Sequence, residues 1–480
     1  MFDTPMQVTV ILYVLDMVFL LFMLFSERSN PSRIIPWAII FLVLPVIGFI
    51  AYLMIGQTFY AKHTFKLKGI KDEEIKQSID IQEYVIAQDE AENMEDASIG
   101  RTMLNCGGEA YSVNNKVELF TEGVDNFEAL FNDLRNAKDF IFIEYFIVKN
   151  DELGNQFLDI LTDKAKEGLE VKLLSDDLGF SGGLGKKARA FRKAGGQFSK
   201  FHAVTTYFLS PKKNNRNHRK IAIIDGKICY CGGFNIGDGY IGKGDLGYWR
   251  DSSVRIRGGA CVGLLMRFVR DWEYASNGEF RRNLAEYIPI DVAKEHGNDR
   301  VEIISGGPDI ADVNPIRMEY LQLIKSAKKS VYIHTPYFMP DDSLKDALSL
   351  AAASGVDVRV IMPDKPDHMF VYWNNVYCAN ILMKRGVKIY MYNNGFVHSK
   401  TIVVDGKYCS VGSANMDDRS LVLNFETNAM ILSRDIGQKM DGAFMKDLEL
   451  STEYSCKDYD NIKGFKALRL VISRLFINLT

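Results

Sequence analysis

The chain has 480 residues, of which 47% are hydrophobic and 25% are charged, so it can form more than one globular domain and is neither disordered nor fibrous. Its formal net charge of -3 argues against a protein that coats nucleic acid, because such proteins are basic overall. Seven cysteines are scattered without the paired spacing of a zinc site, and we expect reduced thiols in a cytosol-facing protein.

Two apolar stretches fill the first sixty residues. Residues 8–25 are interrupted only by Thr9 and Asp16, and residues 34–55 form a second run. Each approaches the ~20 residues that a helix needs to cross a bilayer. A cleaved signal peptide is the alternative for the first stretch, but no basic residue precedes it and no small-residue cleavage site follows it. The pattern predicts a membrane anchor with two transmembrane helices in residues 1–57.

Basic residues suggest an orientation for this helical hairpin. The loop between the stretches carries Arg28 and Arg33, whereas four lysines lie within residues 62–71. Because positive flanks remain on the cytoplasmic side, we expect a multi-pass protein of the cell membrane whose catalytic body is cytoplasmic. Residues 58–104 include an acidic, helix-prone segment, and we expect them to form a solvated linker.

Beyond residue 104 the chain repeats one order of helix, strand, helix and strand. In the first copy these elements are expected at residues 127–137, 139–145, 157–168 and 169–174. In the second copy they are expected at residues 318–327, 330–337, 344–355 and 356–362. A strand, a helix and a further strand joined by a right-handed crossover imply parallel pairing. We therefore predict an α/β fold with two pseudo-symmetric domains, residues 105–294 and residues 295–480.

Each copy ends in a motif that points to chemistry. His218-Arg-Lys220 is matched 180 residues later by His398-Ser-Lys400. Side chains at i and i+2 of a strand share a face, so the histidine and lysine of each motif should point together. An imidazole beside an ammonium group suits an anion, and the imidazole can act as nucleophile or proton carrier. A single His-x-Lys would mean little, but its repetition at one offset favours function.

Further residues recur at the same offset of 180 and extend each motif. They are Asp225 and Asp405, each followed by glycine, and the segments Gly232-Gly-Phe-Asn235 and Gly412-Ser-Ala-Asn415. An Asp-Gly pair between apolar runs predicts a tight hairpin turn, so both aspartates look structural. The small residues let phosphate oxygens approach the backbone, where an asparagine can donate a hydrogen bond. Lysines repel divalent cations and zinc needs three or four donors, so we expect no metal and no other cofactor.

Two copies of His-x-Lys-x4-Asp followed by Gly-Gly/Ser-x-Asn resemble the hallmark of the phospholipase D superfamily over residues 105–480. Finer segments are similar to bacterial cardiolipin synthases; they are Asn217–Lys227, Gly232–Tyr240, Trp249-Arg-Asp251, Thr335–Asp341, Val397–Lys400, Gly412–Ser420 and Asn424-Phe-Glu426. The resemblance implies that phosphatidylglycerol is the substrate. One histidine attacks its phosphodiester, and the other protonates the departing glycerol and then deprotonates the hydroxyl of a second phosphatidylglycerol.

The resemblance also implies roles for individual residues. The histidine of the N-terminal motif is usually the nucleophile, which implies attack by His218 and acid/base catalysis by His398. The phosphate would be held by Lys220, Lys400, Asn235, Asn415 and, in one half only, the hydroxyl of Ser413. Asp251 and Glu426 would orient the imidazoles through their other nitrogen, whereas Asp225 and Asp405 belong to the motif in a supporting role.

Several alternatives remain open. A phospholipase D hydrolase or another phosphatidyltransferase would use the same intermediate. A nuclease is disfavoured because the chain has no clear nucleic-acid-binding module. A membrane scaffold with an inactive site is disfavoured because His and Lys are intact in both motifs. The expected partners are phosphatidylglycerol and an anionic lipid membrane, with no nucleic acid. The basic residues 212–220 are a solvated loop or attract anionic headgroups, and residues 462–479 form a basic amphipathic helix that packs on the fold or lies in the membrane interface. Among the other histidines, His334 is expected to open toward the site.

Overall fold

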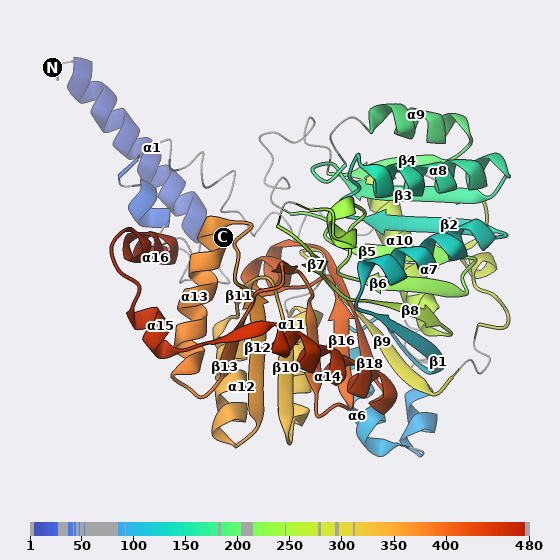
Figure 1. Ribbon diagram of the computed structural model, residues 1–480. Coiled ribbons are helices and arrows are strands. Elements are labelled where there is room, and N and C mark those ends of the chain that lie inside the picture. The colour runs from blue at the N-terminus through green and yellow to red at the C-terminus, as the bar shows by residue number, and fades with distance from the viewer. Residues whose placement is uncertain are drawn as a thin grey trace.

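The computed structural model describes residues 4–26, some positions between 37 and 52, and residues 85–475 except 92, 181–183, 203–214, 245, 277–279, 293–296 and 311–312. Within these residues, fifteen strands form one sheet that is covered by helices on both faces (Figure 1). The sheet consists of two halves of the same topology, which meet where β1 pairs with β9 in antiparallel orientation.

The first half has the strand order β1-β8-β6-β5-β2-β3-β4. The strands are β1 (Ala110–Phe120), β2 (Phe140–Tyr145), β3 (Glu170–Asp176), β4 (Gln197–Phe201), β5 (Lys220–Ile224), β6 (Ile228–Gly232) and β8 (Ser253–Arg257). The helices are α7 (Gly123–Asn136), α8 (Glu152–Lys166), α9 (Gly185–Lys193) and α10 (Ala260–Ser276). The expected parallel pairing of β2 with β3 is confirmed, and α8 begins where the side chain of Asp151 accepts the N–H of Gly154.

The second half repeats this order as β9-β18-β16-β15-β10-β12-β13 and adds β19 at the edge. Its strands are β9 (Asp299–Gly306), β10 (Ser330–His334), β12 (Asp357–Pro363), β13 (Lys388–Tyr392), β15 (Thr401–Val404), β16 (Tyr408–Gly412), β18 (Glu426–Leu432) and β19 (Ser451–Tyr454). Its helices are α11 (Pro315–Ser326), α12 (Asp342–Ala353), α13 (Met369–Met383), α14 (Arg434–Glu449), α15 (Cys456–Asp460) and α16 (Phe465–Leu475). The parallel pairing of β10 with β12 is again as expected.

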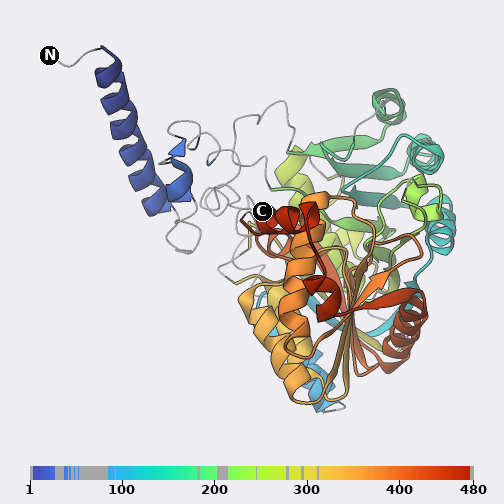
Figure 2. The same cartoon turned by 60° about the vertical axis from the view of Figure 1, so that its left-hand side comes forward.

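The hydrophobic core continues across the join between the halves. One buried cluster includes Phe268 and Trp272 of α10 together with Met440 and Phe444 of α14. Other helices cover the opposite face of each half, α7, α8 and α9 in the first half and α11, α12 and α13 in the second (Figures 1 and 2). Because one cluster includes residues of both halves, their relative position is fixed by the apolar area that they bury together.

Residues 85–105 differ from the solvated linker that we expected for residues 58–104. Ile86 and Met103 are fully buried against the second half. Asp89 pairs with the guanidinium of Arg300 at 2.6 Å, and Asn93 accepts the backbone N–H of Asp96 at the start of α6 (Met94–Asn105). The acidic character misled the prediction because Asp89 and Asp96 are bound within the fold, Asp89 by Arg300 and Asp96 by the hydroxyl of Tyr408. Residues 58–84 lie outside the described residues.

The N-terminal segment contains one long helix, α1 (Thr4–Ser26). Its Val14 and Val18 are 57% and 55% exposed. Met23, near its C-terminal end, packs with Trp37, Phe41 and Tyr52 in a small buried cluster, so α1 contacts the second apolar stretch. Among the described residues, no helix has both the length and the apolar character that a membrane crossing requires. Most of the second expected span lies outside those residues.

Candidate active site

The two histidine motifs lie where the halves meet, just before the strands that we expected to contain them. The strand β5 begins at Lys220 and β15 at Thr401, so both histidines precede a strand. The backbone N–H of His218 donates to the carbonyl of Phe425 at 2.9 Å. The N–H of His398 donates to the carbonyl of Arg250 at 2.7 Å. Each motif is therefore attached through its backbone to the opposite half.

Each imidazole is paired with a carboxylate of the other half. Nδ1 of His398 lies 2.6 Å from Oδ2 of Asp251, and Nδ1 of His218 lies 3.0 Å from Oε2 of Glu426. Glu426 also accepts hydrogen bonds from the hydroxyl of Ser413 and, at 3.2 Å, from the amide of Asn424. Because Nδ1 faces a carboxylate in both cases, Nε2 is the ring nitrogen left to meet a substrate.

Both motif lysines are buried beside the histidines. Nζ of Lys220 donates to the carbonyl of His218 at 2.6 Å, and Nζ of Lys400 donates to the carbonyl of His398. Burial lowers the pKa of Lys220 to about 7 and that of Lys400 to about 8. An anion bound between them would favour their charged form, so the pair is suited to a phosphate group.

Burial also governs the ionisation of the imidazoles and their partners. It lowers the pKa of both His218 and His398, and the nearby lysines act in the same direction. Burial opposes the ionised form of Asp251 and Glu426, but the adjacent lysine and histidine charges outweigh it and lower the pKa of both carboxyls. Without a bound anion, the site therefore contains neutral imidazoles next to ionised carboxylates, and His218 is in the state required of a nucleophile. A phosphate that offsets the lysine charges would favour the protonated imidazole that a general acid requires.

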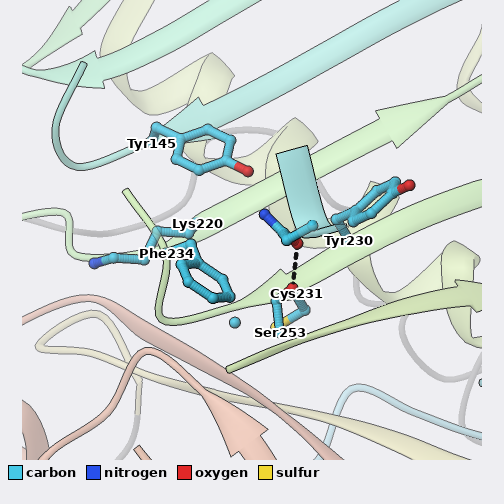
Figure 3. A pocket seen from close by; sticks show the side chains of 8 residues that line it. Tyr145, Lys220, Tyr230, Cys231, Phe234 and Ser253 are labelled. Atoms are coloured by element: carbon cyan, nitrogen blue, oxygen red, sulfur yellow. Dashed lines mark hydrogen bonds between the residues drawn. The ribbon is translucent and has the colours of Figure 1, made fainter. Parts of the chain in front are cut away.

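A small cavity of about 10 Å³ lies behind Lys220 and has room for about one water. It is lined by Asn126, Tyr145, Lys220, Tyr230, Cys231, Gly232, Phe234 and Ser253. Figure 3 shows the amino group of Lys220 pointing away from Tyr230 and Ser253. The cavity thus touches the stem of the lysine and is too small to hold a substrate.

The motif aspartates hold turns together. The carboxylate of Asp225 accepts three backbone N–H groups, those of residues 138–140, at 2.8–3.0 Å. Asp405 accepts the equivalent three, those of residues 328–330, at 2.7–2.8 Å. Asp225 and Gly226 have φ angles of 54° and 64°, as the tight turn predicted from the Asp-Gly pair requires. Both carboxylates support the strands behind the histidines.

The proposed phosphate ligands have contacts within the fold. Asn235 accepts the backbone N–H of Ile147 and donates its amide to the hydroxyl of Tyr240 at 2.8 Å. Asn415 is buried, and its backbone N–H donates to the hydroxyl of Ser420. The hydroxyl of Ser413 is occupied by Glu426. The structure therefore leaves one amide hydrogen of Asn235 and the amide group of Asn415 as potential donors to phosphate and gives the serine a positioning contact.

Two arginines at the site were missed at the level of sequence. Arg219, between the motif residues, is fully buried and donates to the carbonyl of Glu426 at 3.2 Å and to Asp271 of α10 at 2.7 Å. Arg250 donates to the carbonyl of Asp251 and lies 2.9 Å from Asp447 of α14. Each guanidinium thus bonds the backbone of a carboxylate residue that contacts a histidine. Arg219 lies between His218 and Lys220, so its side chain should point away from theirs and into the fold. A buried guanidinium needs an acidic or carbonyl partner, and this requirement could have marked the residue in the sequence.

His334 does not open toward the site as we expected. It is 1% exposed, with Nδ1 3.0 Å from the hydroxyl of Thr401 and Nε2 3.1 Å from Asp447. Aromatic rings line the two motif histidines instead, and the ring centroids of Trp249 and His398 are 5.3 Å apart. In the part of the chain that the structure describes, no cluster of His, Cys, Asp or Glu could hold a metal ion.

Known proteins share these features. The family model described as "Cardiolipin synthase, PLD-like domain" matches residues 130–244 and 320–448, and that described as "Phospholipase_D-nuclease N-terminal" matches residues 14–57. The relative "Cardiolipin synthase 2" of Staphylococcus epidermidis is 40% identical over 93% of this chain and 92% of its own length. "Cardiolipin synthase" of Staphylococcus aureus is also 40% identical, over 93% of this chain and 91% of its own.

A solved structure shares the fold. The phosphatidylserine synthase of Haemophilus influenzae Rd KW20 superposes with a TM-score of 0.60 at 15% sequence identity. The match covers 79% of this chain and 97% of that chain. At this identity the likeness supports the shared phospholipase D-like α/β fold.

Proposed function

Because the chain belongs to the family of phospholipase D-like cardiolipin synthases, it is a phosphatidyltransferase, and we propose that it joins two phosphatidylglycerol molecules into cardiolipin with release of glycerol. The observation that carries this proposal is the pair of imidazoles, His218 and His398, each next to a carboxylate of the opposite half. Transfer at phosphorus needs a nucleophile and a proton carrier around one phosphate, and the two motifs supply one of each.

In the proposed first step, Nε2 of His218 attacks the phosphorus of one phosphatidylglycerol. The bond between phosphorus and the glycerol oxygen breaks, and protonated His398 gives its proton to that oxygen. Asp251 stabilises the imidazolium of His398, and the bound phosphate offsets the lysines that disfavour it. Lys220 and Lys400 neutralise charge that develops on the phosphate oxygens.

In the second step, His398 is neutral and takes the proton from the terminal hydroxyl of another phosphatidylglycerol. The resulting oxygen attacks phosphorus, and the bond to Nε2 of His218 breaks. Cardiolipin leaves and both histidines return to their starting states. Water as the acceptor would give phosphatidic acid instead, so the enzyme depends on an acceptor lipid that reaches His398 before water does.

Product analysis tests the overall reaction. Purified protein is incubated with acyl-labelled phosphatidylglycerol, and the lipids are separated. We expect labelled cardiolipin and an equimolar amount of glycerol. Phosphatidic acid as the sole product would contradict the transferase and would assign a hydrolase.

A trapping experiment tests the histidine roles, because a P–N bond survives alkali. We expect the His398→Ala protein to accumulate label from phosphatidylglycerol that is labelled at its phosphate, since the nucleophile remains but its proton carrier is gone. The His218→Ala protein should acquire no label. Labelling of the His218→Ala protein alone would reverse the two roles, and labelling of neither would contradict a covalent intermediate.

We further propose that residues 1–57 attach the protein to the cell membrane and leave the catalytic halves on its cytoplasmic side. The family match at residues 14–57 and the contact of Met23 with Trp37 and Phe41 support this arrangement. A bilayer would also cover the apolar side chains that α1 exposes. In intact cells, an impermeant amine reagent should label neither Lys186 nor Lys193 until the membrane is permeabilised. Labelling before permeabilisation would place the body outside.

A further inference from the structure

The C-terminal helix α16 buries one side and exposes an apolar one. Leu470 and Ser473 are 7% and 1% exposed, and they face the fold where α16 packs on α13. Phe465 and Leu468 are 67% and 52% exposed. The first turn of α13 adds further apolar side chains to this area. We call it the α13–α16 surface; its exposed apolar residues are Met369, Phe370, Phe465, Leu468, Val471 and Ile472.

Basic side chains flank this surface. Residues 462–475 contain four basic residues and no acidic residue. The guanidinium of Arg469 lies over the ring of Phe465 at 4.6 Å and contacts the sulfur of Met369 at 3.9 Å. Arg474 lies over the ring of Tyr377 of α13 at 4.4 Å. These contacts hold positive charge beside the exposed apolar rings, and this pairing suits the anionic interface of a bilayer.

The α13–α16 surface begins close to the catalytic residues. Asp367, two residues before α13 begins at Met369, accepts the hydroxyl of Tyr337 at 2.5 Å. The charge of Asp367 acts on the buried amino group of Lys400. Both views show α13 and α16 side by side, with α1 nearer to them than to α8 and α9 (Figures 1 and 2). Substrate held in a membrane beneath this surface would therefore lie near the site.

We propose that α16 and the first turn of α13 dock on the anionic bilayer and bring the entrance of the active site to the lipid that it consumes. The inference rests on the proposed function, because phosphatidylglycerol supplies the negative charge. Isolated exposed apolar residues are ordinary on soluble proteins, but contiguous ones with a basic margin mark an interaction site. The absence of acidic residues along α16 favours lipid over a symmetric contact between two copies of this surface, because that contact would place basic side chains against one another.

Fluorescence quenching tests the contact without using activity. The full chain is placed in lipid nanodiscs that contain phosphatidylglycerol with brominated or ordinary acyl chains. The variant Leu468→Trp carries a reporter on α16, and Leu350→Trp is the matched control on α12, where Leu350 is 69% exposed. We expect bromine to remove at least about half of the added emission from Leu468→Trp and none from Leu350→Trp, because quenching requires burial among acyl chains.

Equal quenching of the two reporters would overturn the proposal. A blue shift of Leu468→Trp that depends on protein concentration and not on bromine would also overturn it, since a second copy of the chain would then cover the surface. A protein that docks as proposed but makes no cardiolipin would contradict the proposed function alone, so the two failures are distinguishable.

A kinetic comparison tests the role of charge. Lys466→Gln with Arg469→Gln should raise the apparent KM for phosphatidylglycerol in mixed micelles about 10-fold with kcat unchanged, because each basic residue near an anionic surface contributes severalfold to binding. The control Lys186→Gln with Lys193→Gln removes the same charge from exposed positions of α9. An unchanged KM in the first pair, or an equal rise in both pairs, would overturn the proposal.

Discussion

His218 and Glu426 come from opposite halves and are joined by a contact of 3.0 Å between Nδ1 and Oε2, which His398 and Asp251 repeat in the other direction at 2.6 Å. Neither half alone therefore contains a complete imidazole–carboxylate pair. Because the pairs are crossed, a small rotation between the halves would separate both pairs at once. The hydrophobic core that continues across the join opposes such a rotation.

Replacement of either carboxylate by its amide tests this arrangement. We expect Glu426→Gln and Asp251→Asn to lower kcat on the order of 10²–10⁴-fold, because an amide of the same shape cannot stabilise the imidazolium or hold its tautomer. KM should change little, since neither side chain is proposed to touch substrate. The exposed Glu453→Gln of β19 is the control. A kcat equal to that of the unaltered protein would exclude an orienting role for that carboxylate.

The sequence predicted the carboxylates but not their pairing. A repeat aligns Asp251 with Glu426 and His218 with His398, yet it contains no information about which half faces which. The crossed contacts arise from the backbone bonds of His218 to Phe425 and of His398 to Arg250. Such contacts join residues about 150 to 210 positions apart in the sequence, and local hydrophobic periodicity does not predict contacts over that separation.

The motif aspartates should matter for stability more than for chemistry. Asp225→Ala and Asp405→Ala each leave three backbone N–H groups without their acceptor. We expect each change to destabilise the fold by about 1–3 kcal/mol, as judged by thermal unfolding in detergent. The kcat of the folded fraction at low temperature should stay within about threefold of the unaltered value. A loss of kcat as large as that of His398→Ala would instead place the carboxylate in the chemistry.

The repeated helices and strands, the parallel crossovers and the Asp-Gly turns were predictable because local periodicity and turn chemistry encode them. The packing of residues 85–105 was not predictable, because an acidic segment is expected to be exposed to solvent unless its buried partners are known. Arg300 and Tyr408 supply those partners from distant strands, to Asp89 and Asp96. The buried Arg219 was hidden for the same reason, because its acceptor Asp271 lies on α10.

The buried lysines predict a distinctive pH dependence. The pKa of Lys220 is lowered to about 7 and that of Lys400 to about 8, so both lose positive charge as pH rises through this range in the free enzyme. We expect kcat/KM for phosphatidylglycerol to fall above about pH 7–8, because it reports the free enzyme. The profile of kcat should fall only at higher pH, since bound phosphate favours the ammonium forms. A kcat/KM that stays flat to pH 9.5 would contradict these lowered values.

A buried carboxyl outside the site predicts a change of stability with pH. Glu319 of α11 is fully buried and accepts the amide of Asn428 at 3.1 Å. Burial raises its pKa to about 7, above the ~4.3 of an unfolded glutamate. Between these values the folded state binds a proton that the unfolded state has released, so this group makes stability fall as pH rises. Its contribution across that window is on the order of 3 kcal/mol.

Glu319→Gln removes this titration while keeping the shape of the side chain. The motif histidines His218 and His398 have the opposite effect on stability in part of the same pH window, because their lowered pKa values make stability rise with pH up to about 6.5. The difference between the two proteins isolates Glu319. We therefore expect the melting temperature of the variant, relative to the unaltered protein, to increase steadily from pH 5 to pH 7.5. A difference that is constant across this range would show that Glu319 is ionised in the folded protein.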